Sequence, residues 1–132
     1  MDPASPSRWA DVTGTLASGL CALHCAALGA VPGLAAAAGL PFLENVWFET
    51  GMVVLALSVG MYAAVRGARC AHTEQAVPFF LAGGIALSSG LLVDLMAGHG
   101  SLELVGTVLA IGGGLSMVAG HIANIRCDGV HA

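Results

Sequence analysis

Two cysteines and a histidine within one helical turn are the residues of this chain best suited to bind a metal ion. In Cys21-Ala22-Leu23-His24-Cys25, positions i, i+3 and i+4 share one helical face, so both thiols and the imidazole are expected to point the same way. This soft ligand set suits thiophilic ions such as Hg(II), Cu(I) or Zn(II). The alternative is a structural role, because cysteine packs like a small hydrophobic residue and a lone buried histidine often only hydrogen-bonds to the backbone.

Four apolar runs are long enough to hold such residues inside a membrane. Of the 132 residues, 57% are hydrophobic and 9% are charged, whereas soluble domains carry about 25% charged residues. A transmembrane helix needs about 20 apolar residues. We therefore expect an all-α integral membrane bundle of four transmembrane helices in one domain, residues 1–132, with helices at roughly 11–38, 46–66, 76–96 and 102–126. Pro32-Gly33 is expected to divide the first run, leaving a helix to about Ala30 and a kinked extension beyond it.

The arginines indicate how this bundle is oriented. Arg8 precedes the first helix and Arg126 follows the fourth. Arg66 and Arg69 both follow the second helix. Four spans place all of these arginines on one side, which the positive-inside rule makes cytoplasmic, whereas three spans would scatter them. Both termini are therefore expected to be cytoplasmic.

Two more histidines are candidate ligands on the side of the arginines. His72 lies in the loop after the second helix, and His121 forms an H-x-x-N pair with Asn124 near the end of the fourth. A rise of about 1.5 Å per residue places Cys21 roughly 8 Å deeper than His121. That offset allows either one shared site or two successive binding stations. Two further thiols are expected to be free and reduced in the cytoplasm: Cys70 and Cys127.

A group of acidic residues is expected at the opposite ends of the helices. Its members are Glu44, Glu49, Asp94 and Glu103. Carboxylates in such a group can attract cations electrostatically, but carboxylates at helix ends are also ordinary surface groups. We expect solvation of the membrane surface to be their main role.

Composition excludes a nucleic-acid partner and gives no support for an enzyme. The chain has four arginines, no lysine and a net charge of -4, so it offers no basic patch. No set of nucleophile, base and orienting group is visible in the sequence. We therefore expect a protein that binds no nucleic acid and is not an enzyme.

Over nearly its whole length the chain resembles the MerC family of small bacterial inner-membrane proteins linked to mercury resistance. The resemblance rests on four hydrophobic helices, L-C-A-L-H-C in the first, a loop histidine, and G-H-I-A-N-I-R-C at the end of the fourth. The best-known members carry a C-x-x-C pair, proposed to accept Hg(II) and pass it inward. Here Cys21 and Cys25 are one residue further apart, with His24 between them, as in broader MerC-domain relatives. A second cysteine pair found in some transporters is reduced to Cys127.

The residues and the resemblance together predict a multi-pass protein of the bacterial inner membrane that binds and takes up a thiophilic metal ion, Hg, Zn or Cu. The ion would displace protons from Cys21 and Cys25 and move inward by exchange between Cys and His ligands. The expected partners are the metal ion, the lipid bilayer, and a second copy of the chain or a cytoplasmic metal acceptor protein. The expected ligands are Cys21, His24, Cys25, His72 and His121.

Three alternative functions remain open at this point. A non-transporting protein could hold Zn or Cu through Cys21 and the histidines for structure, sensing or delivery. A haem-binding four-helix redox protein would use His24 and His121 as axial ligands. A purely structural bundle would use its stripes of small residues to contact another membrane protein.

Overall fold

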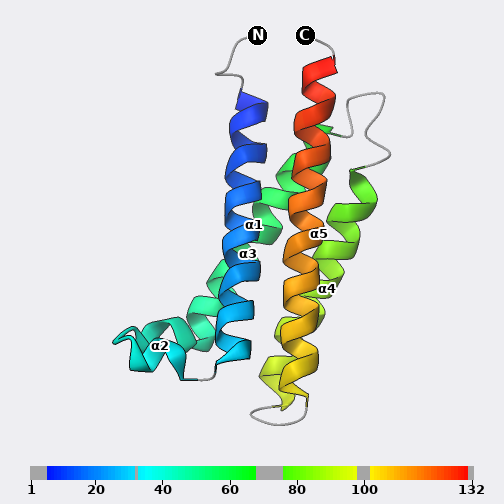
Figure 1. The fold of residues 1–132 in the computed structure, drawn as a ribbon. Helices are drawn as coiled ribbons and strands as arrows, with labels where there is room; N and C mark the ends of the chain where they lie inside the picture. The colour runs from blue at the N-terminus through cyan, green and yellow to red at the C-terminus, as the bar shows by residue number, and fades with distance from the viewer. Residues whose placement is uncertain (1–5, 32, 68–75, 98–101, 131–132) are drawn as a thin grey trace.

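The computed structural model describes residues 6–31, 33–67, 76–97 and 102–130, which form helices and contain no strand. Four of the helices are long and apolar enough to cross a membrane, which confirms the predicted bundle of four transmembrane helices. The long helices run antiparallel to their neighbours in the chain (Figure 1). Their bounds are α1 (Pro6–Ala30), α3 (Val46–Gly67), α4 (Val77–Ala97) and α5 (Glu103–Val130).

Two short elements connect α1 to α3, where the sequence predicts a break. A single turn, α2 (Leu34–Ala37), and a 3-10 turn, η1 (Pro41–Glu44), follow the end of α1 at Ala30. Gly33 precedes α2 with a φ of 78°. This left-handed backbone is readily adopted only by glycine, so Gly33 fixes the change of direction. The extension expected as far as residue 38 is therefore a separate helix rather than a kinked continuation of α1.

Different helix termini lie at the two ends of the bundle. The start of α1, the end of α3, the start of α4 and the end of α5 lie together at what we call the termini end (Figure 1). The opposite end, which we call the pocket end, carries α2, η1, the end of α4 and the start of α5. Arg8, Arg66 and Arg126 are exposed near the termini end, so these arginines share one side as the four-span topology requires.

Glycines allow α5 to pack closely against both α4 and α1. A Cβ atom added to Gly113 would lie 2.7 Å from the backbone nitrogen of Leu87 in α4. A Cβ atom added to Gly114 would lie 2.9 Å from the Cβ of Ala22 in α1. Such small-residue contacts let transmembrane backbones approach each other without a hydrophobic driving force. Helix α5 therefore packs closely against both α1 and α4. Many large apolar side chains are exposed on the outside of the bundle.

The tight α4–α5 packing predicts opposite effects for two neighbouring glycines. Gly113→Ala should destabilise the bundle by about 1–3 kcal/mol, because the added methyl meets backbone atoms that cannot move aside. Gly112→Ala is the matched control, because nothing lies within 4 Å of its added Cβ, and it should be neutral or stabilising by up to about 1 kcal/mol. Thermal unfolding in detergent, followed by circular dichroism, measures both. Equal midpoints for the two variants would contradict this packing.

Candidate functional site

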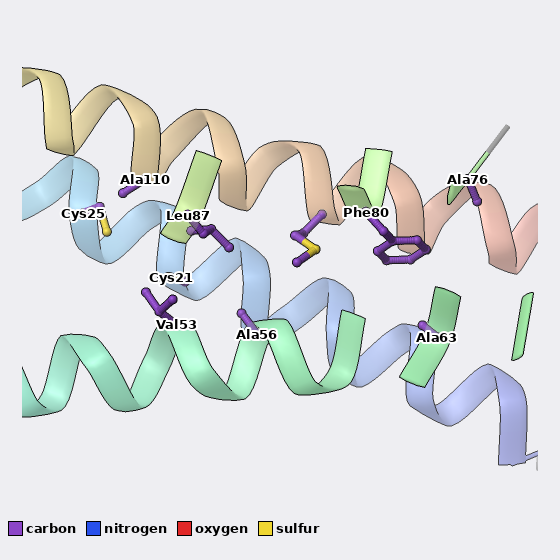
Figure 2. Packing of buried hydrophobic residues seen from close by; sticks show 10 residues of the cluster. Cys21, Cys25, Val53, Ala56, Ala63, Ala76, Phe80, Leu87 and Ala110 are labelled. Atoms are coloured by element: carbon purple, nitrogen blue, oxygen red, sulfur yellow. The ribbon is translucent and has the colours of Figure 1, made fainter. Parts of the chain in front are cut away.

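The two thiols of α1 face each other inside the bundle. Cys21 is 1% exposed and Cys25 is 8% exposed, and their side chains are close enough to interact with each other. Neither of them forms a disulfide. Both belong to the buried cluster that also contains Val53 of α3 and Ala110 of α5 (Figure 2). The structure thus places the predicted pair away from the lipid, with its sulfur atoms together.

The imidazole of His24 lies beside the thiols but is turned toward α3. Its ring is half-buried and lies 5.5 Å from the ring of Phe48, measured between centroids. Both His24 and Cys25 line a pocket of about 280 Å³ at the pocket end. His24 is therefore placed where an arriving ion would meet it before reaching Cys21.

The acidic residues converge on this same pocket. Glu44 is exposed at its mouth, whereas Glu49, Asp94 and Glu103 are half-buried in its wall. The side chains of Glu49 and Asp94 are close enough to share a hydrogen bond. The carboxylate of Asp94 also lies over Gly106 of α5, which has no side chain to displace it. The sequence predicted these carboxylates at one end of the bundle, and the structure adds that they come from different elements and line one cavity.

The depth of the lining residues shows how the pocket relates to the thiols. From the pocket end inward, the lining of α5 runs from Glu103 to Ala110, and that of α1 runs from Gly29 to His24. His24, Cys25 and Ala110 are therefore its deepest lining residues. The walls of the cleft carry carboxylates and no arginine or lysine, and such a charge distribution raises the local concentration of cations. Cys25 lies at the deep end of this acidic cleft.

His121 belongs to a separate polar cluster near the termini end. Its ring is fully buried, and its Nδ1 atom lies 2.9 Å from Oδ1 of Asp11 in α1. Asn124 donates a hydrogen bond from Nδ2 to the same oxygen at 3.3 Å, and another to the carbonyl of Ala63 at 3.1 Å. The cluster therefore connects α1, α3 and α5 through groups that lipid could not satisfy.

The other nitrogen of the His121 ring has no hydrogen-bond partner among the described residues. The ring lies over Gly14 of α1, where any side chain would collide with it. Phe80 of α4 packs edge-on against the ring, with a centroid separation of 4.8 Å and an interplanar angle of 80°. Nε2 is thus held in the protein interior with its hydrogen-bonding capacity unused.

The register of α1 against α5 separates His121 from the thiols. Thr107 packs on Gly29, and His121 packs on Gly14, so the two helices run antiparallel with fixed offsets. Seven residues separate Gly14 from Cys21, which corresponds to about 10 Å along the helix axis. Cys21 and His121 therefore do not share one site. In the described part of the chain, no group of three or more His, Cys, Asp or Glu residues forms a ready-made metal site.

The same register bears on the alternative of a haem protein. The ring of His121 packs on Gly14, which precedes His24 by ten residues on α1, a separation of about 15 Å along the helix axis. The two imidazoles cannot both coordinate one iron atom at that separation.

The remaining predicted ligand, His72, lies outside the residues that the structure describes.

A comparison with known families agrees with this architecture. The sequence model of the family described as MerC mercury resistance protein matches residues 11–126. The chain belongs to the MerC family. It is accordingly a multi-pass membrane protein of a mercury-resistance family. No curated protein and no solved structure matches the chain significantly.

Asp11 is the site residue of this MerC protein that sequence reasoning missed. The sequence predicts a first helix that starts at residue 11, whereas α1 begins at Pro6, so Asp11 lies more than one turn inside the helix and is 5% exposed. The signal was available in two forms. A lone carboxylate near the membrane interior needs a partner, and His121 with Asn124 offers donors at a similar depth on another helix.

The Asp11–His121 contact predicts energetic coupling between the two residues. In a double-mutant cycle with Asp11→Ala and His121→Ala, the coupling should be about 0.5–3 kcal/mol, because each single variant leaves the other group buried without its partner. The measurement is the free energy of unfolding in detergent. Leu104→Ala is the control partner for Asp11→Ala, because Leu104 is 68% exposed at the pocket end. Additivity for both pairs would show that the contact does not form.

Proposed function

We propose that this MerC-family protein takes up mercuric ion, or a similarly soft ion, by binding it between Cys21 and Cys25. The observation that carries the proposal is the position of two buried, mutually facing thiols at the deep end of an acidic pocket. Thiolates are the preferred protein ligands of soft metals. Carboxylates would gather the cation, and the sulfur atoms would select it.

The spacing of the two thiols suits an ion that accepts two sulfur ligands. Residues at i and i+4 hold their Cβ atoms about 5–6 Å apart. Two metal–sulfur bonds of about 2.3 Å each, the length found for zinc, reach across such a gap. Each thiol gives up one proton as its bond to the metal forms. A divalent ion with two thiolates is electrically neutral, so the loaded pair avoids the cost of a buried charge.

The metal ion would enter through the pocket, and the protons released by the thiols would leave through it. Glu49, Asp94 and Glu103 lower the energy of a cation in the pocket, and His24 can hold it transiently at the level of Cys25. The two protons released by the thiols leave through the same pocket to its carboxylates or to water. With only two strong ligands at the thiol pair, the ion is exchangeable, whereas a closed four-ligand site would retain it.

The direction of uptake follows from the charge distribution. Arg8, Arg66 and Arg126 lie near the termini end, which we therefore assign to the cytoplasm. The pocket then opens on the outer face of the bacterial inner membrane, and the ion moves inward. A thiol-bearing acceptor protein in the cytoplasm would take it from the termini end, and a second copy of the chain remains a candidate partner.

Removal of the two membrane thiols should abolish binding. Introduced into the Cys70→Ser, Cys127→Ser variant, Cys21→Ser with Cys25→Ser should lose stoichiometric mercuric-ion binding by the protein in detergent, because serine offers no soft donor and no other cysteine remains. The readout is bound metal per protein after dialysis against a weak competing ligand. Cys70→Ser with Cys127→Ser is the matched control, because it removes the same number of thiols and should retain the bound ion. Retention of the ion by the first variant would refute the proposal.

Neutralising the pocket should slow capture without removing the thiol site. Glu49→Gln with Asp94→Asn should reduce uptake into membrane vesicles at limiting ion concentration by about tenfold, because electrostatic attraction raises encounter rates. The amount bound at saturation should stay unchanged. Added salt should bring the wild-type rate toward that of the variant. A variant with the wild-type rate at low salt would exclude the carboxylates from capture.

A further inference from the structure

A line of buried groups continues inward from the thiols along the interior face of α1. Asp11, Gly14, Ser18, Cys21 and Cys25 follow one another at spacings of three or four residues, and all five are buried. The hydroxyl oxygen of Ser18 is fully buried and has no hydrogen-bond partner in the described chain. Unpaired polar atoms are costly in a membrane interior, so their presence on this line calls for a transient ligand.

A methionine of α5 lies at the same depth as Ser18. Met117 is 2% exposed, and its sulfur atom occupies the space left by Gly60 of α3. The contacts that set the α1–α5 register place Met117 level with Ser18, between the levels of Cys21 and His121. Met117 and His121 also share one face of α5 because they are four residues apart. Successive donors from Cys25 to His121 are thus separated by about 5–6 Å along the axis.

We propose that this line is the inner part of the transport route. The ion passes from the thiol pair to the thioether of Met117 and then to Nε2 of His121, and Asp11 is the positioning residue that holds His121 ready. This inference rests on the proposed uptake function and extends it beyond the thiols. The cargo it implies is a soft cation, because the thioether and thiolate donors bind soft metals in preference to Mg²⁺ or Ca²⁺.

The hydrogen bonds around His121 leave its Nε2 atom suited to bind a metal ion. A carboxylate only accepts hydrogen bonds, so Nδ1 of His121 donates to Asp11 and leaves the lone pair on Nε2. Histidines that bind metals commonly donate their other ring N–H to a carboxylate in this way. Asn124 in turn holds Asp11 by donating to the same oxygen.

The exchange conserves charge and protons at each step. As the lone pair of Met117 binds the ion, the bond to one cysteine sulfur breaks, and that thiolate takes a proton from water in the pocket. As Nε2 of His121 binds, the second sulfur is released and protonated in the same way. The two protons lost on loading are thereby restored, and neither Met117 nor His121 has to give up a proton of its own.

The test uses full-length protein in vesicles whose lumen holds a thiol chelator, with the pocket end outward. Two quantities are measured: mercuric ion bound to the protein and mercuric ion delivered to the lumen. Asp11→Asn should leave binding at the thiols intact and lower delivery by about 10–100-fold, the usual effect of losing a metal ligand's supporting carboxylate. Met117→Leu keeps the volume and should also lower delivery. Met61→Leu, at a position 68% exposed on α3, is the matched control.

A spectroscopic measurement separates positioning from a general loss of structure. With ¹⁵N-labelled histidine in the Cys70→Ser, Cys127→Ser background, a second equivalent of mercuric ion should shift the Nε2 resonance of His121. His121→Gln identifies that resonance, and Asp11→Asn should weaken its shift while circular dichroism stays unchanged. Persistence of the full shift in Asp11→Asn would exclude the positioning role.

The outcomes distinguish this inference from the proposed function. Wild-type delivery by folded His121→Gln or by Met117→Leu would overturn the inner route while leaving the thiol site in place. Loss of the thiol-bound ion in Asp11→Asn would also overturn it, because the inner station must not be needed for loading. Wild-type delivery by Cys21→Ser with Cys25→Ser would instead contradict the uptake function itself.

Discussion

Lipid offers no hydrogen bonds, so every polar group inside this bundle must be paired within the protein or left unpaired at a cost. The protein places its polar groups on the interior face of α1 and the facing side of α5. Asp11 is paired with His121 and Asn124, and the two thiols are paired with each other. Close packing of glycines on α5 makes this arrangement possible, because it fixes which residues of the two helices lie level.

Soft-metal transport fits such a bundle because binding there replaces thiol protons with an ion of matching charge. The thiol pair is strong enough to select the ion but lacks the third and fourth ligands that would trap it. The acidic pocket on one side and His121 on the other offer weaker donors on either side of that pair. In the proposed route the donor atoms change from carboxylate oxygen to cysteine sulfur and then to histidine nitrogen, and the ion would pass between them without a large conformational change.

Hydropathy alone predicted the four spans, because each apolar run is long enough to cross the membrane and must do so as a helix. The break at Gly33 and the shared face of Cys21 and Cys25 followed from local rules for glycine and for helical spacing. Contacts between helices could not be read in the same way. The pairing of Asp11 with His121 depends on the register of α1 against α5, and that register is set by glycines whose partners the sequence does not identify.

The acidic residues illustrate the same distinction. The sequence places Glu49 and Asp94 at one end of the bundle, but their convergence on Cys25 depends on how three helices are rotated relative to one another.

X-ray absorption on mercury-loaded membranes tests the central claim most directly, because it counts the sulfur atoms around the ion. In protein that carries Cys70→Ser and Cys127→Ser, the account predicts two sulfur neighbours of the ion, and none from the protein when Cys21 and Cys25 are also replaced by serine. A mercury environment of oxygen and nitrogen alone in the wild-type protein would contradict it.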